Sequence, residues 1–546
     1  MMQHFYDKSG NSRSKAVAWT ARQKLAVSTI LIWLALSLVM SSLAQGEIIY
    51  AMNREPDMFD LHVGSSRYDL VVAANVFDTY LYLTEDGEFL PWLAEEVTAS
   101  DDATMYTITL REGVTFHDGT PLNAEAVQFN FDRIVNPDTA SRAAVGDMGS
   151  YNRTEIVDDL TVNVFFDEPH PAFWFALSDW RAGGPHSPAA LQADAEGFKQ
   201  MPVGTGPFVF VDWQQGDSLI LEANPDYAWP NPLAERSGPP SLERVVFRFL
   251  REDQSRVIAL TTGEVNAIMR VPPQNVAELD SNPDIYTASR VLPGTGVILV
   301  VNGSKPPTDD PAVRQALLLA SSPQQISRIG YFNAWSAHAG SVLSAPNPGF
   351  VDLSENNGFD PEAAAQILED AGWVMGSDGI REKDGVTASL EYIGFPSAET
   401  TRVIELMQAT LRPIGIDVTI KELDAGAIQK ARQDGEHNIA HLTWIFKDAG
   451  FLRTLFHSEN IGTGWNFTHR PMPEIDALLE QAEIEADLAS RQAIFTEVQE
   501  TMLEEAMVIP TVYQQAINAF RNEVQGVKLY DVYGEAPYFY EAFVAE

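Results

Sequence analysis

The chain has 546 residues, a formal net charge of −40 at pH 7 and no cysteine. This acidity argues against a nucleic-acid-binding protein and against adhesion to anionic lipid, because both need a basic surface. Without cysteine there is no disulfide framework, no thiol nucleophile and no soft metal site.

Residues 1–44 have the pattern of an export signal. Five basic residues precede an apolar run over 25–40, and Ser42-Leu43-Ala44 places small residues where a signal peptidase reads. A membrane anchor is the alternative, but this run of sixteen residues is shorter than the roughly 20 that span a bilayer. The sequence predicts cleavage near Ala44 and a periplasmic protein. It cannot be a lipoprotein because there is no cysteine to carry the lipid.

The segment 90–137 combines a strand, a turn and a helix. From Tyr106 to Leu110, apolar residues alternate with threonines, which predicts a strand with one buried face. Residues 117–121, HDGTP, are dense in turn formers, and Asn123 can cap the helix that follows.

The same alternation of element types continues along the chain. Residues 245–250 are apolar and β-branched, and residues 256–262 have a helical pattern. This order predicts an α/β fold with mixed sheets.

Residues 110–127, LREGVTFHDGTPLNAEAV, closely resemble the signature of extracellular solute-binding protein family 5. This family comprises the oligopeptide-, dipeptide- and nickel-type receptors of bacterial ABC importers. Shorter strings resemble further motifs of the family: VGTGPF (203–208), NPDY (224–227), GEVN (263–266), VRQA (313–316) and EIDALL (474–479). Two motifs depart from the family pattern. The proline of its opening LDPH is missing after Asp60, and Ser322-Pro323 replaces the usual DR.

The resemblance implies a periplasmic-binding-protein-like, type II, two-lobe fold with mixed sheets and an extra inserted domain. Carried onto this sequence, it predicts domain I (45–75, 188–292 and 512–546), an inserted domain II (76–187) and domain III, the second lobe (293–511). The chain would then cross between the lobes near Leu292 and Val512, and hinge motion there would close the cleft on a ligand.

Trp444 and the loop after it are the first candidates for ligand contact. In peptide receptors of this family, an aspartate three residues after this tryptophan pairs with the α-ammonium group of the peptide. Here that position is Lys447, Asp448 comes one residue later, and the loop is shorter. Either Asp448 moves into the ammonium site, or Lys447 faces the cleft and the ligand carries a carboxylate, phosphate or hydroxyls. A Lys447 side chain that points to solvent is the remaining alternative. We prefer the second alternative, a ligand that does not depend on a free α-amino group.

Loops that would face the same opening supply the remaining candidates. They are Ser65, Ser66, Arg67, Tyr68, Arg142, Tyr151, His441 and Trp465. The last of these lies in a glycine-rich loop, which favours an exposed aromatic ring.

An enzyme is not expected. The chain has no G-x-S-x-G or H-E-x-x-H motif and no P-loop, and Gly204-Thr205-Gly206 is better explained as a tight turn. A strand pattern around His437 and His441 argues against a helical metal site, and we expect neither a metal nor another cofactor.

The sequence therefore predicts the periplasmic substrate-binding subunit of an ABC importer. We expect it to be monomeric, to bind a peptide or similar small solute, and to deliver it to a membrane permease driven by cytoplasmic ATPases. A receptor on the same fold for an oligosaccharide, opine or other anionic solute is the alternative. A secreted hydrolase would require a convergent Ser, His and Asp.

Overall fold

The computed structural model describes residues 46–338, 340–356, 358–394, 397–530 and 535–545. The predicted export signal lies outside these ranges. Within them, no helix combines the length and the apolar character needed to cross a membrane.

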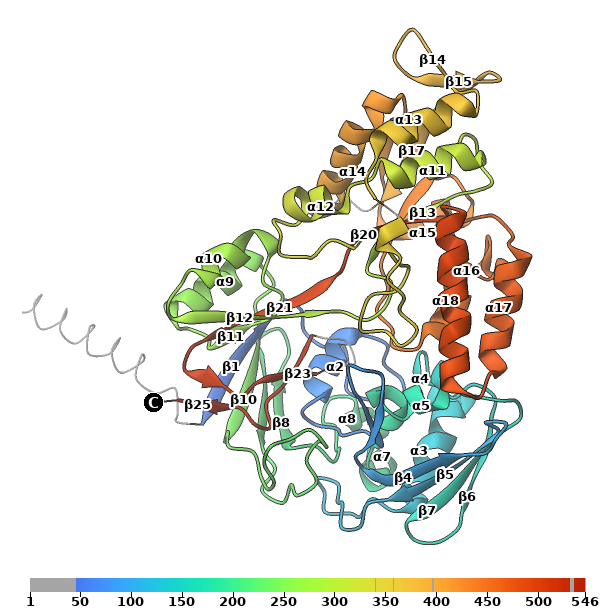
Figure 1. Cartoon of the computed structure of the whole chain (residues 1–546). Helices are drawn as coiled ribbons and strands as arrows, with labels where there is room; N and C mark the ends of the chain where they lie inside the picture. The colour runs from blue at the N-terminus through green and yellow to red at the C-terminus, as the bar shows by residue number, and fades with distance from the viewer. Residues whose placement is uncertain (1–45, 339, 357, 395–396, 531–534, 546) are drawn as a thin grey trace, which may run out of the picture.

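The first lobe is built on a seven-stranded mixed sheet (Figure 1). Strands β10 and β11 run parallel to β1, whereas the other neighbours are antiparallel. In spatial order the strands are β12 (Ile285–Val291), β21 (Gln515–Arg521), β11 (Ala267–Ile268), β1 (Glu47–Met52), β10 (Arg244–Phe249), β9 (Ser218–Ala223) and β8 (Phe208–Gln214).

Helices α9 (Asp253–Thr262) and α10 (Val276–Asp280) accompany this sheet. The strand and helix expected over 245–250 and 256–262 are thus confirmed as β10 and α9. Two small two-stranded sheets from the end of the chain complete this region: β22 (Val524–Gln525) with β25 (Phe543–Val544), and β23 (Lys528–Tyr530) with β24 (Ala536–Tyr538).

A four-stranded antiparallel sheet and its helices form the inserted part of this lobe. The strands are β4 (Ala94–Ala99), β5 (Met105–Leu110), β7 (Thr161–Phe166) and β6 (Tyr151–Ile156), and a hairpin of β2 (Leu81–Leu83) and β3 (Phe89–Pro91) precedes them. The helices of this part are α3 (Ala124–Val135), α4 (Ala144–Asp147), α5 (Phe173–Ala176) and α6 (Trp180–Gly183), and it is flanked in the sequence by α2 (Arg67–Ala73), α7 (Pro188–Ala193) and α8 (Ala195–Phe198).

The predicted strand–turn–helix of this region is confirmed. Alternate residues of β5 are buried, and the side-chain oxygen of Asn123 accepts a hydrogen bond from the N–H of Ala126 at 3.0 Å, which caps α3.

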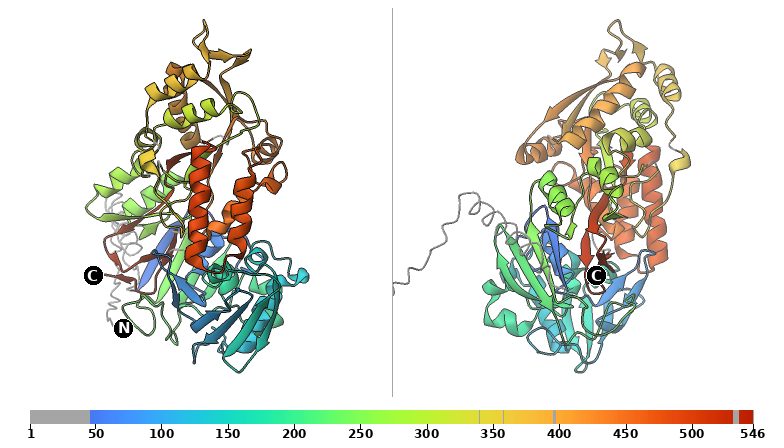
Figure 2. Two further views of the ribbon diagram at one scale, coloured as in Figure 1. Left: turned by 45° about the vertical axis from the view of Figure 1, so that its right-hand side comes forward. Right: turned by 90° about the vertical axis from the view of Figure 1, so that its left-hand side faces the viewer.

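The second lobe is built on a five-stranded sheet in the order β18 (Asp417–Glu422), β17 (Ser389–Gly394), β19 (Ile439–Leu442), β13 (Val297–Val301) and β20 (Val508–Val512). Its helices are α11 (Pro311–Leu319), α12 (Pro323–Gln325), α13 (Pro361–Asp370), α14 (Ala398–Leu411), α15 (Ala425–Gln433), α16 (Leu452–Phe456), α17 (Pro473–Ile484) and α18 (Leu488–Glu504). A small sheet of β14 (Val374–Met375), β15 (Arg381–Lys383) and β16 (Val386–Thr387) lies at one end. Helices α17 and α18 pack side by side and reach towards the four-stranded sheet (Figures 1 and 2).

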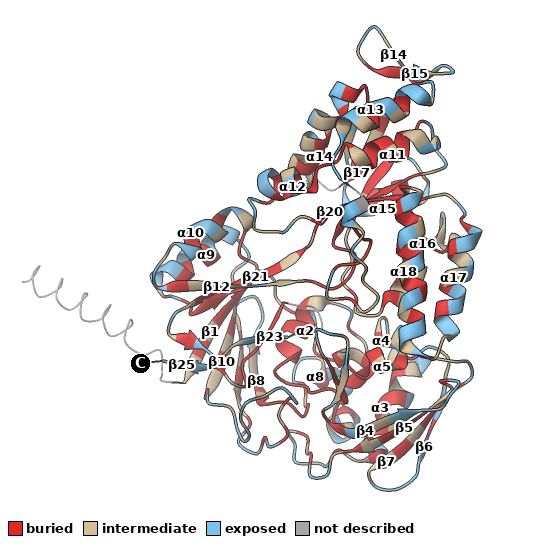
Figure 3. Ribbon diagram, viewed as in Figure 1, coloured by how far each residue is buried: buried red, intermediate tan, exposed pale blue. Residues whose placement is uncertain are grey.

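The central strand β13 shows why both faces of the five-stranded sheet are covered. Its sequence VILVV is apolar at every position and buried throughout. Leu299 and Val301 belong to one buried cluster, and Ile298 and Val300 belong to another. Figure 3 shows the buried strands inside and the exposed helix faces outside. A strand that is apolar at consecutive positions is typical of a sheet covered on two sides.

The chain passes between the two sheets at two neighbouring places. One connection joins β12 to β13, and the other joins β20 to β21. The N–H of Leu292 donates to the carbonyl of Gln514 at 2.8 Å, which holds the connections together. Gly294 in the first connection has φ +115, and a Cβ atom there would lie 1.8 Å from the carbonyl oxygen of Trp444. Leu292 lies in the first connection, and Val512 is the last residue of β20, directly before the second.

The turn of the 110–127 segment packs against the VGTGPF motif. Nε2 of His117 lies 2.9 Å from the carbonyl oxygen of Gly206, and Asp118 accepts a hydrogen bond from Ser187. A Cβ atom at Gly206 would lie 2.5 Å from the backbone of Val76. The serine contacts the aspartate and the histidine contacts a carbonyl, so these residues do not have the order of a Ser–His–Asp triad. Both motifs hold the inserted part against the first lobe.

Candidate functional site

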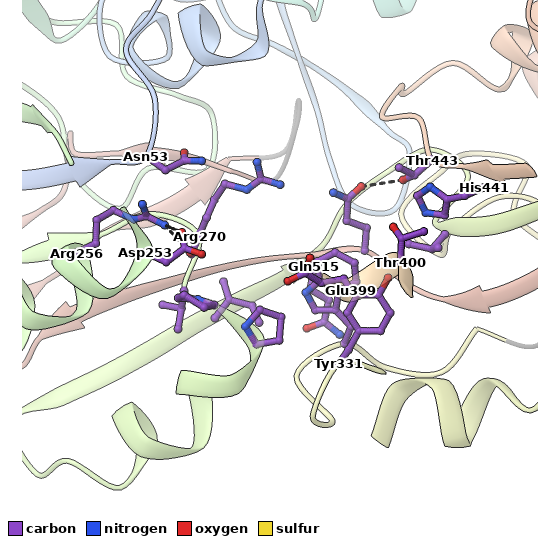
Figure 4. Close-up of a pocket in the computed structure, with 17 residues that line it drawn as sticks. Asn53, Asp253, Arg256, Arg270, Tyr331, Glu399, Thr400, His441, Thr443 and Gln515 are labelled. Carbon is purple, nitrogen blue, oxygen red and sulfur yellow. Dashed lines mark hydrogen bonds and ion pairs between the residues drawn. The ribbon is translucent and has the colours of Figure 1, made fainter. Parts of the chain in front are cut away.

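A cavity of about 330 Å³ lies between the two lobes, next to the two connections. Residues of both lobes line it: Asn53, Asp253, Arg256, Arg270, Val271, Pro272, Pro273, Gln515 and Ile517 on the side of the seven-stranded sheet, and Val297, Tyr331, Trp335, Glu399, Thr400, His441, Thr443 and Gln514 across or beside the connections. Figure 4 shows Asn53, Asp253, Arg256 and Arg270 on one side and Tyr331, Glu399, Thr400, His441 and Thr443 on the other. Its volume is at the lower end of the roughly 300–1,000 Å³ of small-molecule sites.

Arg256 and Asp253 form a closed ion pair in one wall. Nη2 of Arg256 donates to Asp253 at 2.6 Å, and Nη1 donates to the carbonyls of Leu250 and Arg251 at 2.9 and 3.0 Å. The arginine side chain is 1% exposed. Because its charge is neutralised and both terminal nitrogens are engaged, Arg256 holds the wall and is not available to a ligand.

Arg270 differs from Arg256 because it extends into the cavity (Figure 4). Its Nη1 donates to the hydroxyl of Tyr68 at 3.0 Å, and its Nε lies 3.3 Å from Oε1 of Glu535. The same glutamate lies 3.8 Å from Nε of Arg67. We call Arg67, Tyr68, Arg270 and Glu535 the arginine corner. Two guanidinium charges share one carboxylate there, which leaves an excess positive charge at the cavity.

The electrostatics of the corner agree with this excess. Burial alone would raise the pKa of Tyr68, but the charges of Arg270 and Arg67 outweigh it, and the pKa lies below its ordinary value. The backbone of Arg270 has φ 53, in the left-handed region, which costs about 1 kcal/mol or more for a residue with a Cβ atom. Strain of this kind is common where a side chain must be aimed at a ligand.

The facing wall is aromatic and polar. The rings of Tyr331 and Trp335 stack at 4.4 Å with an interplanar angle of 12°. The hydroxyl of Thr443 donates to Oε1 of Gln514 at 3.0 Å, and Glu399, in the first turn of α14, adds a carboxylate. This wall offers a flat apolar surface together with hydrogen-bonding groups, the usual composition of a specific small-molecule site.

His441 also lines the cavity, from strand β19. Burial lowers its pKa to about 4, and the charge of Arg432 acts in the same direction. The imidazole is therefore neutral at pH 7 and contributes hydrogen bonding without charge. Of the eleven candidates from the sequence, all within the described residues, His441 alone belongs to the cavity lining.

Four candidates lie at the start of α2, beside the cavity. Tyr68 is buried, and its hydroxyl meets Asn53 and Arg270, which both belong to the lining. Arg67 belongs to the arginine corner. Ser66 caps α2 by accepting from the N–H of Tyr68 at 3.3 Å, and Ser65 is exposed. This loop contacts the cavity lining through the hydroxyl of Tyr68.

Trp444 is half-buried and does not belong to the cavity lining. Its ring lies 4.7 Å from that of Trp465 and 5.3 Å from that of Phe451. The backbone N–H of Trp444 donates to the hydroxyl of Thr295 at 3.1 Å. The structure brings the two candidate tryptophans together as the edge of a buried cluster, where each covers the other.

Asp448 corrects one of the two alternatives for the loop after Trp444. Its carboxylate is engaged by Nη1 and Nη2 of Arg491 at 2.5 and 2.9 Å, so it is not free for a ligand ammonium group. Burial would raise the pKa of Asp448, but the charge of Arg491 and these hydrogen bonds outweigh it and lower the pKa. The neighbouring Lys447 is half-buried, lies outside the cavity lining, and its carbonyl accepts from Asn347 at 3.2 Å. Arg270, in contrast, lines the cavity and extends into it.

Arg142 and Tyr151 lie in the inserted part, away from the cavity lining. Arg142 is exposed. The hydroxyl of Tyr151 donates to Asp132 at 2.6 Å, and the ring packs against Phe166 at 6.3 Å.

Apart from His441, the lining residues were missed by sequence reasoning, among them Asn53, Arg270, Trp335, Glu399 and Gln514. A weak signal was present for two of them. Arg270 follows a short apolar strand and precedes Pro272-Pro273, which is typical of a loop leaving a sheet edge. Trp335 ends the segment YFNAW, which has no strand or helix period.

A buried cluster of Asp60, His62 and His186 could be considered as a metal site. Arg133 donates to both carboxylate oxygens of Asp60 at 3.0 and 2.5 Å, and its Nη1 lies 2.8 Å from Nδ1 of His62. Burial lowers the pKa of both histidines, that of His186 to about 4. The guanidinium supplies the positive charge that a metal ion would bring. The cluster is therefore a buried ion network that joins the first lobe to the inserted part.

Comparison with known proteins agrees with this architecture. The family model described as "Bacterial extracellular solute-binding proteins, family 5 Middle" matches residues 88–463. The glutathione-binding protein GsiB of Salmonella typhi is 27% identical over 501 residues, covering 89% of this chain and 92% of that protein.

Solved structures share the fold at lower identity. The ABC transporter substrate-binding protein CtaP of Listeria monocytogenes superimposes with a TM-score of 0.79 at 23% identity, covering 92% of this chain and 100% of that chain. The oligopeptide-binding protein AppA of Bacillus subtilis, solved with a nonapeptide, gives 0.70 at 20% identity, with coverage of 92% and 99%.

Proposed function

The chain belongs to the bacterial extracellular solute-binding proteins of family 5, and we propose that it captures a short peptide or peptide-like solute in the cavity between its lobes. Members of this family are receptors and not enzymes, and they work with the permeases of ABC importers. The observation that carries the proposal is the cavity itself, with a cationic wall on one lobe and an aromatic, polar wall on the other.

The size of the cavity favours a ligand of two or three residues. A volume of about 330 Å³ suits a small molecule better than a long peptide. Two comparisons support this size: the GsiB relatives are named for glutathione, a tripeptide, and a solved neighbour from Pseudoalteromonas at 23% identity holds the dipeptide Met-Leu. The preference from the sequence, that a free α-amino group is not required, remains part of the proposal because Asp448 is engaged by Arg491.

An anionic solute other than a peptide is the second candidate. The excess positive charge of the arginine corner favours it, and a neighbour of the same fold, AgaA of Agrobacterium tumefaciens, was solved with agropinic acid. Both candidates place negative charge near Arg270, and they differ in whether a peptide bond is required.

The proposal extends to location and partners. We expect export with cleavage near Ala44, a monomer in the periplasm, and delivery of the ligand to a permease driven by cytoplasmic ATPases. Closure would bend the two connections near Leu292 and Val512, so small-angle scattering should give a smaller radius of gyration at saturating ligand. An unchanged radius would contradict capture by closure.

The ligand experiment starts with mass spectrometry of whatever is carried through purification. Calorimetric titration then compares ligand-free protein with glutathione, dipeptides, tripeptides, N-acetylated tripeptides and an opine. We expect the tightest binding from a dipeptide or tripeptide and little loss on N-acetylation. Tight binding of the opine with no binding of any peptide would replace the proposal by the second candidate. Loss of peptide binding on N-acetylation would restore the dependence on an α-ammonium group.

A further inference from the structure

We infer that Arg270 and Asn53 form a subsite for a ligand carboxylate that has an amide N–H beside it, as at the C-terminal residue of a peptide. This inference rests on the proposed function and adds the orientation of the ligand. Arg270 is the specificity-determining residue, and Arg67, Tyr68 and Glu535 position it.

Arg270 has an unused hydrogen-bond donor on the cavity side. Nε and Nη1 of Arg270 are engaged by Glu535 and Tyr68, and no described residue accepts a hydrogen bond from its Nη2. The side chain is 28% exposed although it lines an interior cavity. A guanidinium with a free nitrogen on the cavity side is suited to a carboxylate, because charge-assisted hydrogen bonds are about twice as strong as neutral ones.

The arginine corner carries an excess positive charge. Glu535 is 3% exposed and faces both arginines, but its Oε2 has no hydrogen bond within the described part of the chain. One carboxylate cannot neutralise two guanidinium groups. A ligand carboxylate would complete the charge balance, whereas an ammonium group would meet repulsion from two cations.

Asn53 has an unused hydrogen-bond acceptor beside Arg270. Nδ2 of Asn53 lies 3.4 Å from the hydroxyl of Tyr68, the same atom that accepts from Arg270. Oδ1 of Asn53 is buried and has no hydrogen-bond partner among the described residues. A buried acceptor without a partner is uncommon in proteins and indicates a missing donor. An N–H next to the ligand carboxylate would supply that donor.

The free donor, the excess positive charge and the free acceptor together define the ligand group. Arg270 is suited to bind an anion. Asn53 contacts the same tyrosine oxygen, and its free acceptor requires an N–H within a few ångströms of that anion. A carboxylate separated from an amide nitrogen by one carbon atom satisfies both. The remainder of the ligand would then extend towards the stacked Tyr331 and Trp335 and towards Glu399 on the facing wall.

The test uses matched pairs of probes on the full mature protein. Ala-Ala-Ala is titrated against its C-terminal amide, and N-acetylglycine against N-acetylglycinamide. We expect each free acid to bind about 10- to 100-fold more tightly than its amide, the range for a charge-assisted hydrogen bond. In Arg270→Gln this discrimination should disappear, and in Arg270→Lys it should be reduced but retained because the charge remains.

Arg54→Gln is the matched control. Arg54 lies over the same Tyr68 ring, 5.3 Å from its centroid, but it is exposed and pairs with Asp57. Its substitution should leave the discrimination unchanged, and thermal melting should show that all three variants fold.

The outcomes separate this inference from the proposed function. Peptide binding without discrimination between acid and amide would overturn the subsite and keep the peptide receptor. Binding of N-acetylglycine in an Arg270-dependent way, without binding of any peptide, would keep the subsite and overturn the peptide receptor. No binding of any free acid, or discrimination that survives in Arg270→Gln, would overturn the inference.

Discussion

Two arginine–carboxylate arrangements in this protein use the same chemistry for different ends. Asp448 and Arg491 are matched one to one: the carboxylate accepts two hydrogen bonds from Arg491 and one from the N–H of Gly450, and Nε of Arg491 donates to the carbonyl of Ala482 at 2.8 Å. In the arginine corner, one glutamate serves two arginines, and Arg270 keeps a nitrogen free towards a cavity. A complete set of partners fixes a loop, whereas an incomplete set leaves room for a ligand.

Breaking the matched pair should have the largest effect. Arg491→Leu leaves the largely buried Asp448 without its partner, and we expect it to lower the free energy of unfolding by about 3–5 kcal/mol. Urea unfolding measures this. The double variant Asp448→Leu/Arg491→Leu is the control and should recover most of the loss. A loss below 1 kcal/mol in the single variant would show that the pair does not fix the loop.

Two tryptophans distinguish the cavity from the loop that the Asp448–Arg491 pair fixes. Trp335→Ala removes half of the stacked pair in the cavity wall, so we expect binding of the best tripeptide to weaken by roughly 2 kcal/mol with little change in stability. Trp444→Ala removes the ring that packs on Trp465, so we expect a loss of about 2–3 kcal/mol in unfolding free energy. Calorimetry and urea unfolding separate the two. If Trp444→Ala lost more affinity than Trp335→Ala, Trp444 would be a ligand residue after all.

Removing the shared glutamate should make the charge excess visible. Glu535→Gln leaves Arg67 and Arg270 without an anion, and we expect a destabilisation of about 1–2 kcal/mol. N-acetylglycine should then raise the melting temperature more in the variant than in the unmodified protein, because a second positive charge is free. An equal rise in both proteins would mean that Glu535 does not compete with a ligand for the corner.

The smallest expected effect is the pH dependence of the matched pair. Because the pKa of Asp448 is lowered below its ordinary value of 3.8, its ionised form adds stability above that pH. As the pH falls through the lowered pKa, the carboxylate is protonated and this contribution is lost. The difference in unfolding free energy between the unmodified protein and Asp448→Asn should therefore be constant near neutral pH and shrink below pH 3.8. A difference that grew on acidification would contradict the assignment.

Local patterns in the sequence were sufficient for much of the fold. The strand from Met105 to Leu110, the cap at Asn123 and the helix after it follow from residue period and side-chain chemistry, which act over a few residues. The family resemblance added the two-lobe architecture and the expectation of two crossings between the lobes. These features depend on contacts between neighbours in sequence or on motifs that pack against each other, as His117 does against Gly206.

The cavity could not be read in the same way. Asn53, Arg270, Trp335 and Glu399 are far apart in the sequence, and only the packing of two lobes brings them to one space. Trp444 and Asp448 carry residue types that a ligand site needs, yet long-range partners, Trp465 and Arg491, already occupy them.

The sequence by itself determined the fold class and the kind of protein, because secondary-structure periods and motif strings are written in consecutive residues. Only the tertiary structure decided which charged groups keep hydrogen-bond donors or charge without a partner. Arg256, Arg270 and Arg491 are the same amino acid, and their neighbours in sequence do not show how many partners each side chain meets in the fold. What distinguishes Arg270 is that its surroundings supply fewer partners than its charge and donors require.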